Sequence, residues 1–178
     1  DANNVIIYMN ETVTAMFQRN ELELRKVMPH FDARSLIGAS IDRFHKNPGQ
    51  QRSMLATLKN VHRTQFQAGS LYFGLAANPI VDAQGQRVGT VVEWADRTAE
   101  VNVEKDVASI VQAAADGNFS QRLRMDDKIG FFATLSAGMN QLMETCEQGL
   151  NDVSALLAAF AQGDLTQRIT REYGGLFG

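Results

Sequence analysis

The sequence predicts an α+β domain with an antiparallel sheet, followed by an all-α segment that forms a parallel helical bundle or coiled coil. Strand and helix patterns are mixed up to about residue 100, whereas residues 101–178 show no strand pattern and no proline. The two patterns meet at residues 88–100. There, apolar residues alternate as in a strand up to Trp94 and then recur every three or four residues as in a helix. We therefore expect a strand that continues directly into a long amphipathic helix.

Composition limits the class of protein. The 178 residues are 44% hydrophobic with a formal net charge of −3, which suits one or two folded domains and gives no reason to expect nucleic acid as a partner. Apolar runs fall short of the roughly 20 residues that a membrane helix needs. The single cysteine, Cys146, favours a reducing compartment, so we expect a cytoplasmic domain. The chain opens without Met and is expected to belong to a longer protein, with or without a membrane anchor.

Turn-forming residues divide the first hundred residues into elements. The expected order is a strand, two short helices, an irregular segment at 36–45, a third helix and three antiparallel strands. A hairpin turn is expected at 68–70 and a second turn at 78–79 with 82–85. The expected bounds are 5–10 for the first strand, 11–20, 21–28 and 50–59 for the helices, and 62–67, 71–77 and 88–94 for the later strands.

Residues 101–178 contain an internal repeat. Residues 115–123 match residues 161–169 at an offset of 163 − 117 = 46 positions, which is typical of stacked supersecondary units. Between the copies, apolar residues at steps of four and three predict a seam where one helix winds around partner helices. The expected seam residues are Leu135, Met139, Leu142, Cys146, Gly149, Val153, Leu156 and Phe160.

Residues 3–98 resemble a PAS domain. The resemblance lies in the strand at 7–10, the turn at 78–85 and the closing Asp96-Arg97-Thr98, which is similar to the Asp-x-Thr motif that couples PAS domains to an output helix. Asp96 and Thr98 also fit a simple helix cap. The resemblance implies a five-stranded sheet. Four strands are found in the sequence, so the first is expected to lie before residue 1.

The 46-residue repeat resembles HAMP modules. The pattern is close at Gly163 and Asp164 and looser at Gly117, while Lys128 stands where the family has an acidic residue. We expect a PAS domain at 1–98, a HAMP-like unit with its leading helix at 99–148, and a second, truncated HAMP-like unit at 149–178. This order resembles a bacterial chemoreceptor of the methyl-accepting type. The residues expected to carry the signal are Asp96, Thr98, Gly117, Gly163 and Asp164.

The chemoreceptor resemblance also implies partners. The chain is expected to form a parallel homodimer and to act on a histidine kinase and its adaptor through sequence beyond residue 178. No phosphate-binding glycine loop and no nucleophile–base arrangement is found in the sequence, so we expect no enzyme activity.

A narrower resemblance concerns the ligand. Residues 41–48 are similar to a segment of soluble aerotaxis-type receptors, in which a histidine on a short helix ligates haem iron and a tryptophan on the last strand faces bound oxygen. The resemblance implies that His45 is the proximal ligand of haem b and that Trp94 donates a hydrogen bond to O2 or another diatomic gas. The apolar pocket is expected to be lined by Phe44, Leu36, Ile41, Leu55, Phe66, Phe73, Leu75 and Val92.

Other interpretations of the same residues stay open. His45 beside Lys46 fits a surface or capping histidine, and Trp94 fits an ordinary core aromatic residue. The PAS domain would then bind FAD or a small metabolite, or hold a filled core that serves only as a dimer contact. The three histidines and the cysteine lack the spacing of a zinc site.

Overall fold

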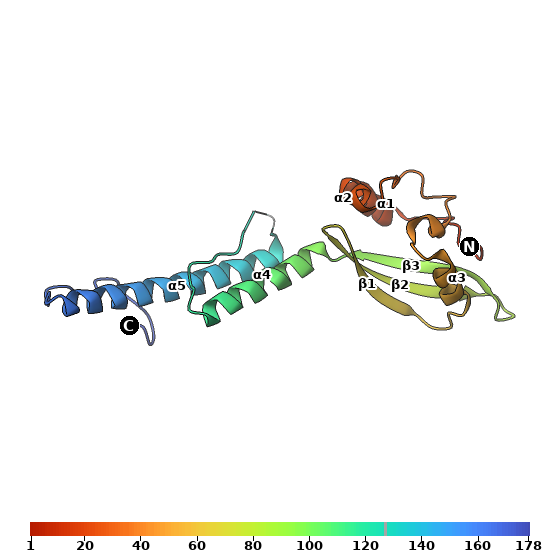
Figure 1. Cartoon of the computed structure of the whole chain (residues 1–178). Helices are drawn as coiled ribbons and strands as arrows, with labels where there is room; N and C mark the ends of the chain where they lie inside the picture. Colours follow the sequence, from red (N-terminus) through yellow and green to blue (C-terminus); the bar gives the residue numbers. More distant parts are fainter. Residues whose placement is uncertain (127) are drawn as a thin grey trace. The chain divides into compact units, whose positions relative to one another are not determined.

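The computed structural model describes residues 1–126 and 128–178, and the chain divides into two compact units, Asp1–Val101 and Asn102–Gly178 (Figure 1). The boundary lies within helix α4 (Thr98–Ala115), so one helix belongs to both units. None of the helices in the described ranges combines the length and the hydropathy that a membrane crossing requires.

Short helices precede the sheet in the first unit. They are α1 (Glu11–Arg19), α2 (Glu21–Val27), the 3₁₀-helix η1 (Ile41–Phe44) and α3 (Pro48–Ala56). α1 begins after Asn10, whose side-chain oxygen accepts a hydrogen bond from the Val13 backbone N–H at 2.9 Å. α3 begins with Pro48, which suits the first helical position because the missing N–H would have no partner there. Asn20 alone separates α1 from α2.

The sheet consists of three antiparallel strands in the order β1-β2-β3: β1 (His62–Ala68), β2 (Leu71–Val81) and β3 (Arg87–Asp96). The predicted hairpin turn is confirmed, and Gly69 adopts a φ of +64°, which glycine tolerates without strain. The predicted turn at Asn78-Pro79 is wrong, because β2 continues to Val81. Pro79 is tolerated because β1 begins with His62, opposite Ala77, and does not extend past it, so this end of β2 has a strand neighbour on one side only.

The predicted strand at 5–10 is also wrong. The segment makes one isolated bridge, between Val5 and Ser40, flanked by backbone hydrogen bonds of Ile6. The partner segment is too short to extend this pairing, since Gly38 has a φ of +85° and Ser40 already caps η1. In the described residues the sheet therefore has three strands instead of the four found in the sequence.

The core of the first unit lies between the helices α1 and α2 and the hairpin end of β1 and β2 (Figure 1). Its buried residues are Met16, Phe17, Leu24, Phe31, Ala33, Leu36, Ala68, Leu71 and Phe73. The strand register pairs Phe66 with Phe73, Leu75 with Trp94, and Ala77 with Val92, so these side chains share one face of the sheet. We name the face that carries Phe66, Phe73, Leu75, Val92 and Trp94 the inner face.

In the second unit, α4 packs against α5 (Gly130–Ala161). Ile110 of α4, Leu123 of the connecting segment and Met143 of α5 are 2%, 6% and 0% exposed and form its core. Met143 is not part of the predicted seam, whereas the seam residues Leu142 and Val153 are 54% and 47% exposed. The seam residue Met139 does pack against this core, so the contact within this chain uses a stripe of α5 that overlaps the predicted seam only in part. The seam as a contact between chains stays a prediction.

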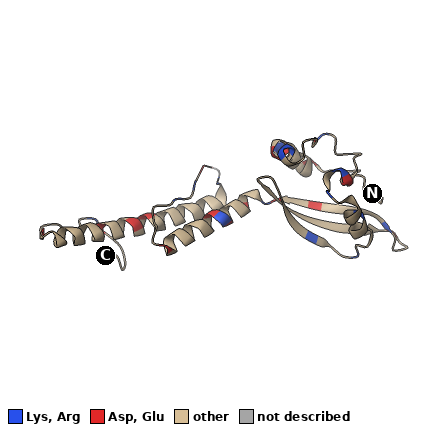
Figure 2. Cartoon of the chain, in the orientation of Figure 1, with Lys and Arg blue, Asp and Glu red and all other residues tan. Residues whose placement is uncertain are grey.

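The charges of α5 are all acidic: Glu144, Glu147 and Asp152 (Figure 2). Arginines of the segments that follow α4 and α5 pair with two of them. A guanidinium nitrogen of Arg122 lies 2.6 Å from Glu147, and Nε of Arg171 lies 3.5 Å from Asp152. Because these pairs are partly exposed, each contributes only about 0–1 kcal/mol, and their main effect is to orient the connecting segments.

Candidate functional site

His45 follows η1 directly, and its ring is exposed. Its Nδ1 lies 2.8 Å from the backbone oxygen of Ile41. A carbonyl oxygen can only accept, so Nδ1 carries a hydrogen, and in the neutral form of the ring the lone pair is then on Nε2. Histidines that bind metals use this arrangement, in which one ring nitrogen donates to a backbone carbonyl and the other faces the metal. His45 is therefore held in the tautomer that a proximal haem ligand requires.

The segment that carries His45 is fixed from two sides. Phe44 packs edge-on against Phe31 with a centroid distance of 6.0 Å, which attaches η1 to the core. Asp42 of η1 forms an ion pair with Arg52 of α3, and this hydrogen-bonded guanidinium holds the pKa of Asp42 below its ordinary value. The backbone that positions the imidazole is thus anchored to both the core and α3.

Trp94 lies on the inner face, in the middle of an aromatic cluster. Its ring is 5.1 Å from that of Phe17, 5.8 Å from that of Phe66 and 5.9 Å from that of Phe73, in edge-to-face arrangements. Such pairs add about 0.5–1.5 kcal/mol each beyond burial. Because Phe17 belongs to α1, the cluster joins α1 to the last strand of the sheet.

The remaining predicted pocket residues fall into two groups. Leu36 and Phe73 are 3% and 1% exposed and belong to the core, against which Phe44 and Trp94 pack. Phe66 and Val92 lie on the inner face but remain 39% and 38% exposed. Ile41 and Leu75 are half-buried, and Leu55 is buried on α3. The inner face is therefore covered at its hairpin end and keeps uncovered apolar surface at Phe66 and Val92.

Asp96, at the end of β3, holds the start of α4. Its Oδ1 accepts hydrogen bonds from the backbone N–H of Thr98 at 3.1 Å and from the Thr98 hydroxyl at 2.6 Å. The same hydroxyl oxygen accepts from the Tyr72 N–H at 3.0 Å, and the Arg97 N–H donates to the Tyr72 oxygen at 2.8 Å. We name Tyr72, Asp96, Arg97 and Thr98 the joint, because they connect β2, β3 and α4.

Two residues that the sequence analysis missed also hold the joint. Asn20 Nδ2 donates to Asp96 Oδ2 at 2.9 Å, and a guanidinium nitrogen of Arg19 lies 3.4 Å from the same oxygen. Burial acts to raise the pKa of Asp96, but the hydrogen bonds from Thr98, Asn20 and Arg19 outweigh it and keep the pKa below its ordinary value. Asn20 is the last residue of the predicted helix 11–20, and an asparagine at a helix end suggests only a cap.

The two copies of the repeat end their helices in the same way. Gly117 and Gly163 adopt φ values of +79° and +84°, which side chains with a Cβ disfavour. The N–H of the next residue, Asn118 or Asp164, reaches back to the carbonyl five positions earlier at 2.8 and 3.0 Å. The repeat found in the sequence thus corresponds to a repeated helix-ending motif.

The side chains after these glycines form matching turns. Asn118 Oδ1 accepts from the Ser120 N–H and hydroxyl at 3.1 and 2.8 Å, and Asp164 Oδ1 accepts from those of Thr166 at 2.9 and 2.6 Å. The Thr166 and Gln167 hydrogen bonds lower the pKa of the Asp164 carboxyl. Each turn sends the chain from the end of a helix into a connecting segment.

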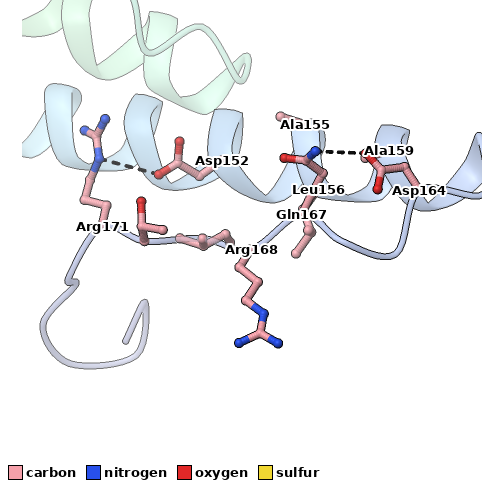
Figure 3. A pocket seen from close by; sticks show the side chains of 10 residues that line it. Asp152, Ala155, Leu156, Ala159, Asp164, Gln167, Arg168 and Arg171 are labelled. Carbon is pink, nitrogen blue, oxygen red and sulfur yellow. Dashed lines mark hydrogen bonds and ion pairs between the residues drawn. The ribbon is translucent and has the colours of Figure 1, made fainter.

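The two connecting segments differ in what covers them. In the first, Asn140 of α5 binds both the N–H of Leu123 at 2.7 Å and its carbonyl oxygen at 2.9 Å. In the second, the matching residue Ile169 is 39% exposed and lines a surface pocket of about 340 Å³ against α5 (Figure 3). Figure 3 shows Arg171 paired with Asp152 at one end of this pocket. This pocket is lined by residues of the second unit, whereas the predicted ligand residues belong to the first.

Comparisons with known proteins agree with this organisation. The HAMP domain family matches residues 128–178. The methyl-accepting chemotaxis protein McpB of Pseudomonas aeruginosa is 49% identical over 173 residues, which are 97% of this chain and 26% of that protein, so the chain spans about a quarter of this relative. A solved structure of the Aer2 receptor from Vibrio cholerae, described as a dual PAS-heme oxygen sensor, matches 54% of this chain and 87% of that chain, at 32% identity and a TM-score of 0.49. The predicted fold class is confirmed, since an α+β unit with an antiparallel sheet and short flanking helices precedes helical structure. Residues 128–178 of that helical structure match the HAMP domain family, and the chain is similar to a segment of a methyl-accepting chemotaxis protein.

Proposed function

We propose that the first unit binds haem b through His45 and responds to O2 or another diatomic gas. The observation that carries this proposal is the orientation of the imidazole: Nδ1 donates to the Ile41 carbonyl, which leaves the lone pair on Nε2 of an exposed ring. In the whole receptor, the signal would pass through the joint and α4 to the HAMP helices, and then to a histidine kinase and its adaptor.

The residues of the inner face fit such a group. Phe66 and Val92 offer uncovered apolar surface of the kind that a macrocycle needs, and His45 offers an imidazole. Haem b would supply reversible binding of a diatomic gas. The indole N–H of Trp94 can only donate a hydrogen bond, which would favour oxygen over the less polar carbon monoxide.

The path from this site to the output helix is short. Trp94 and Asp96 are two positions apart on β3 and therefore share its inner face. A shift of the Trp94 ring moves the carboxylate that holds the first residue of α4. The signal is then a shift in the populations of two arrangements of the first turn of α4. The size of this shift is limited by the difference in gas affinity between the two arrangements.

The proposal assigns residues 1–98 to the PAS domain, 99–148 to a first HAMP-like unit and 149–178 to a second one. A parallel homodimer in the cytoplasm would supply the partner helices for the seam. The exposure of Leu142 and Val153 within one chain supports such a contact, since large apolar side chains in a regular stripe are commonly covered by another helix.

Haem content tests the ligand assignment. We expect the purified chain, reconstituted with haem, to hold a stoichiometric amount and to show a Soret band that shifts on reduction and again with oxygen. His45→Ala should abolish stoichiometric haem, whereas the control His30→Ala, an exposed histidine in a turn, should leave it unchanged. Full haem content in the His45→Ala chain would overturn the assignment.

A filled core that serves as a contact between copies is the second candidate. It is favoured by the packing around Trp94, where the rings of Phe17, Phe66 and Phe73 already make edge-on contacts. This candidate predicts a colourless chain after reconstitution with either haem or FAD. A flavin spectrum would instead identify the third interpretation, a PAS domain that binds FAD.

A further inference from the structure

Asn20 occupies a capping position but does not cap. It is the residue before α2, where an asparagine side chain ordinarily accepts a hydrogen bond from the first turn, yet its side chain makes no such bond. Asn10, in the same position before α1, does make it, to the Val13 N–H at 2.9 Å. The amide of Asn20 is instead turned to Asp96, which lies 76 residues further along the chain.

α1 is attached to β3 at two points. Phe17 contacts the ring of Trp94 at 5.1 Å, and three residues later Asn20 donates to the carboxylate of Asp96. Residues three apart lie on the same side of a helix, and residues two apart lie on the same face of a strand. A displacement of Trp94 can therefore be transmitted to Asp96 along β3 and also through Phe17 and the C-terminal end of α1.

The two oxygens of Asp96 divide their roles. Oδ1 holds Thr98, and Oδ2 is held by Asn20 at 2.9 Å, while Arg19 is more distant at 3.4 Å and has a side chain that is 68% exposed. The Asn20 bond is partly buried, so it is the stronger restraint on the orientation of the carboxylate. Without it, Oδ2 keeps only the longer contact with the exposed Arg19, so the carboxylate is less restrained and its hold on the first turn of α4 weakens.

We propose that Asn20 is a positioning residue for the joint and that α1 is a second route by which the first unit controls the start of α4. This inference rests on the joint used in the proposed function but not on haem. It can therefore be tested in a chain that takes up no haem.

The test is amide hydrogen exchange in the 178-residue chain, read at the Val101 N–H, which donates to the Arg97 oxygen in the first turn of α4. Asn20→Ala should speed this exchange about tenfold, because a hydrogen bond to a charged group is lost. The matched control Asn10→Ala removes a true cap of α1 and should leave exchange at Val101 within about twofold of wild type.

Asn20→Asp separates positioning from capping. Aspartate caps α2 at least as well as asparagine, but its charge repels Asp96, so exchange at Val101 should be as fast as in Asn20→Ala or faster while the stability of α2 is kept. Wild-type exchange at Val101 in both Asn20 variants, or the same acceleration in Asn10→Ala, would overturn the inference. A failure of His45 to bind haem would overturn the proposed function and leave this exchange pattern unaffected.

Discussion

The turns at Asp96 and Asp164 have the same local hydrogen bonds, but their aspartates differ in whether they contact other elements of the fold. In both, Oδ1 of the aspartate accepts a 2.6 Å hydrogen bond from the hydroxyl of the threonine two residues later. The second oxygen of Asp96 binds Asn20, which lies between α1 and α2 and 76 residues away, whereas that of Asp164 binds Gln167, three residues away. One Asp-x-Thr pattern thus makes a joint between elements in the first unit and a self-contained turn in the second.

The difference shows that the pattern determines the turn, while the neighbours determine its function. An aspartate bound only within its own turn can stiffen a connection, but it responds to nothing outside it. An aspartate shared between α1, β3 and α4 changes when any of the three moves. Asp96 is therefore suited to pass on a signal, and Asp164 is suited to shape the end of a helix.

Removal of each carboxylate in turn should show the largest difference between the two turns. Asp96→Ala leaves the partly buried donors of Asn20 and Thr98 without an acceptor, so we expect it to reduce the free energy of unfolding of the first unit by about 2–3 kcal/mol. Asp164→Ala should have a clearly smaller effect, because its donors turn to water. Urea unfolding followed by Trp94 fluorescence and by helical circular dichroism measures both. Equal losses would contradict the distinction.

The two connecting segments allow a second comparison. Asn140→Ala removes both hydrogen bonds to the backbone of the buried Leu123 and should cost about 2 kcal/mol in the unfolding of the second unit. Asn151→Ala is the matched control, since Asn151 is an exposed asparagine of the same helix. Denaturation in guanidinium chloride, followed by circular dichroism, is the measurement. A loss that is the same for both variants would show that Asn140 does not hold the first connecting segment.

The helix-ending glycines should behave alike, in contrast to the aspartates. Gly117→Ala and Gly163→Ala each force a residue with a Cβ into a positive φ and should each destabilise by about 1–2 kcal/mol. Gly138→Ala is the control of opposite sign, because Gly138 lies inside α5 with open space around it and should gain about 1 kcal/mol in helix propensity. Thermal unfolding would record these shifts. A stabilising Gly117→Ala would contradict the observed helix end.

Acid should weaken the joint more than the second turn. The pKa of Asp96 is lower in the folded chain than in the unfolded one, so its contribution to stability is complete above the unfolded value of about 3.9 and is lost as the pH falls through the lower folded value. The pKa of Asp164 is also lowered in the folded chain, but its carboxylate is bound only by Thr166 and Gln167 of its own turn. Urea unfolding between neutral pH and pH 3 gives the slope of the free energy of unfolding against pH. We expect Asp96→Asn to reduce this slope and Asp164→Asn to leave it almost unchanged.

Local patterns predicted much of the fold. The hairpin glycine at residue 69, the alternation up to Trp94 and the helical spacing after Arg97 led to β1, β2, β3 and α4, because turn chemistry and periodicity act over a few residues. The segment at 5–10 failed, because its β-branched residues favour a strand but a ladder also needs a partner of sufficient length.

The site was predictable only in part. His45, Trp94 and Asp96 stand out because a known motif surrounds each of them. Asn20 does not stand out, because its partner is 76 residues away and the local sequence does not predict such a distant side-chain contact. Met143 was missed for a similar reason, since an apolar stripe on α5 looks the same whether α4 or another chain covers it.

Oxygen affinity in the haem-loaded chain tests the central claim most directly, because coupling between two sites is reciprocal. If gas binding changes the start of α4 through the joint, then Asp96→Asn must change the affinity for oxygen in turn. We expect a shift of roughly fivefold or more in a spectroscopic titration of the reduced chain, and no shift for Asp164→Asn. Identical affinities in wild type and both variants, or a chain that takes up no haem, would contradict the account.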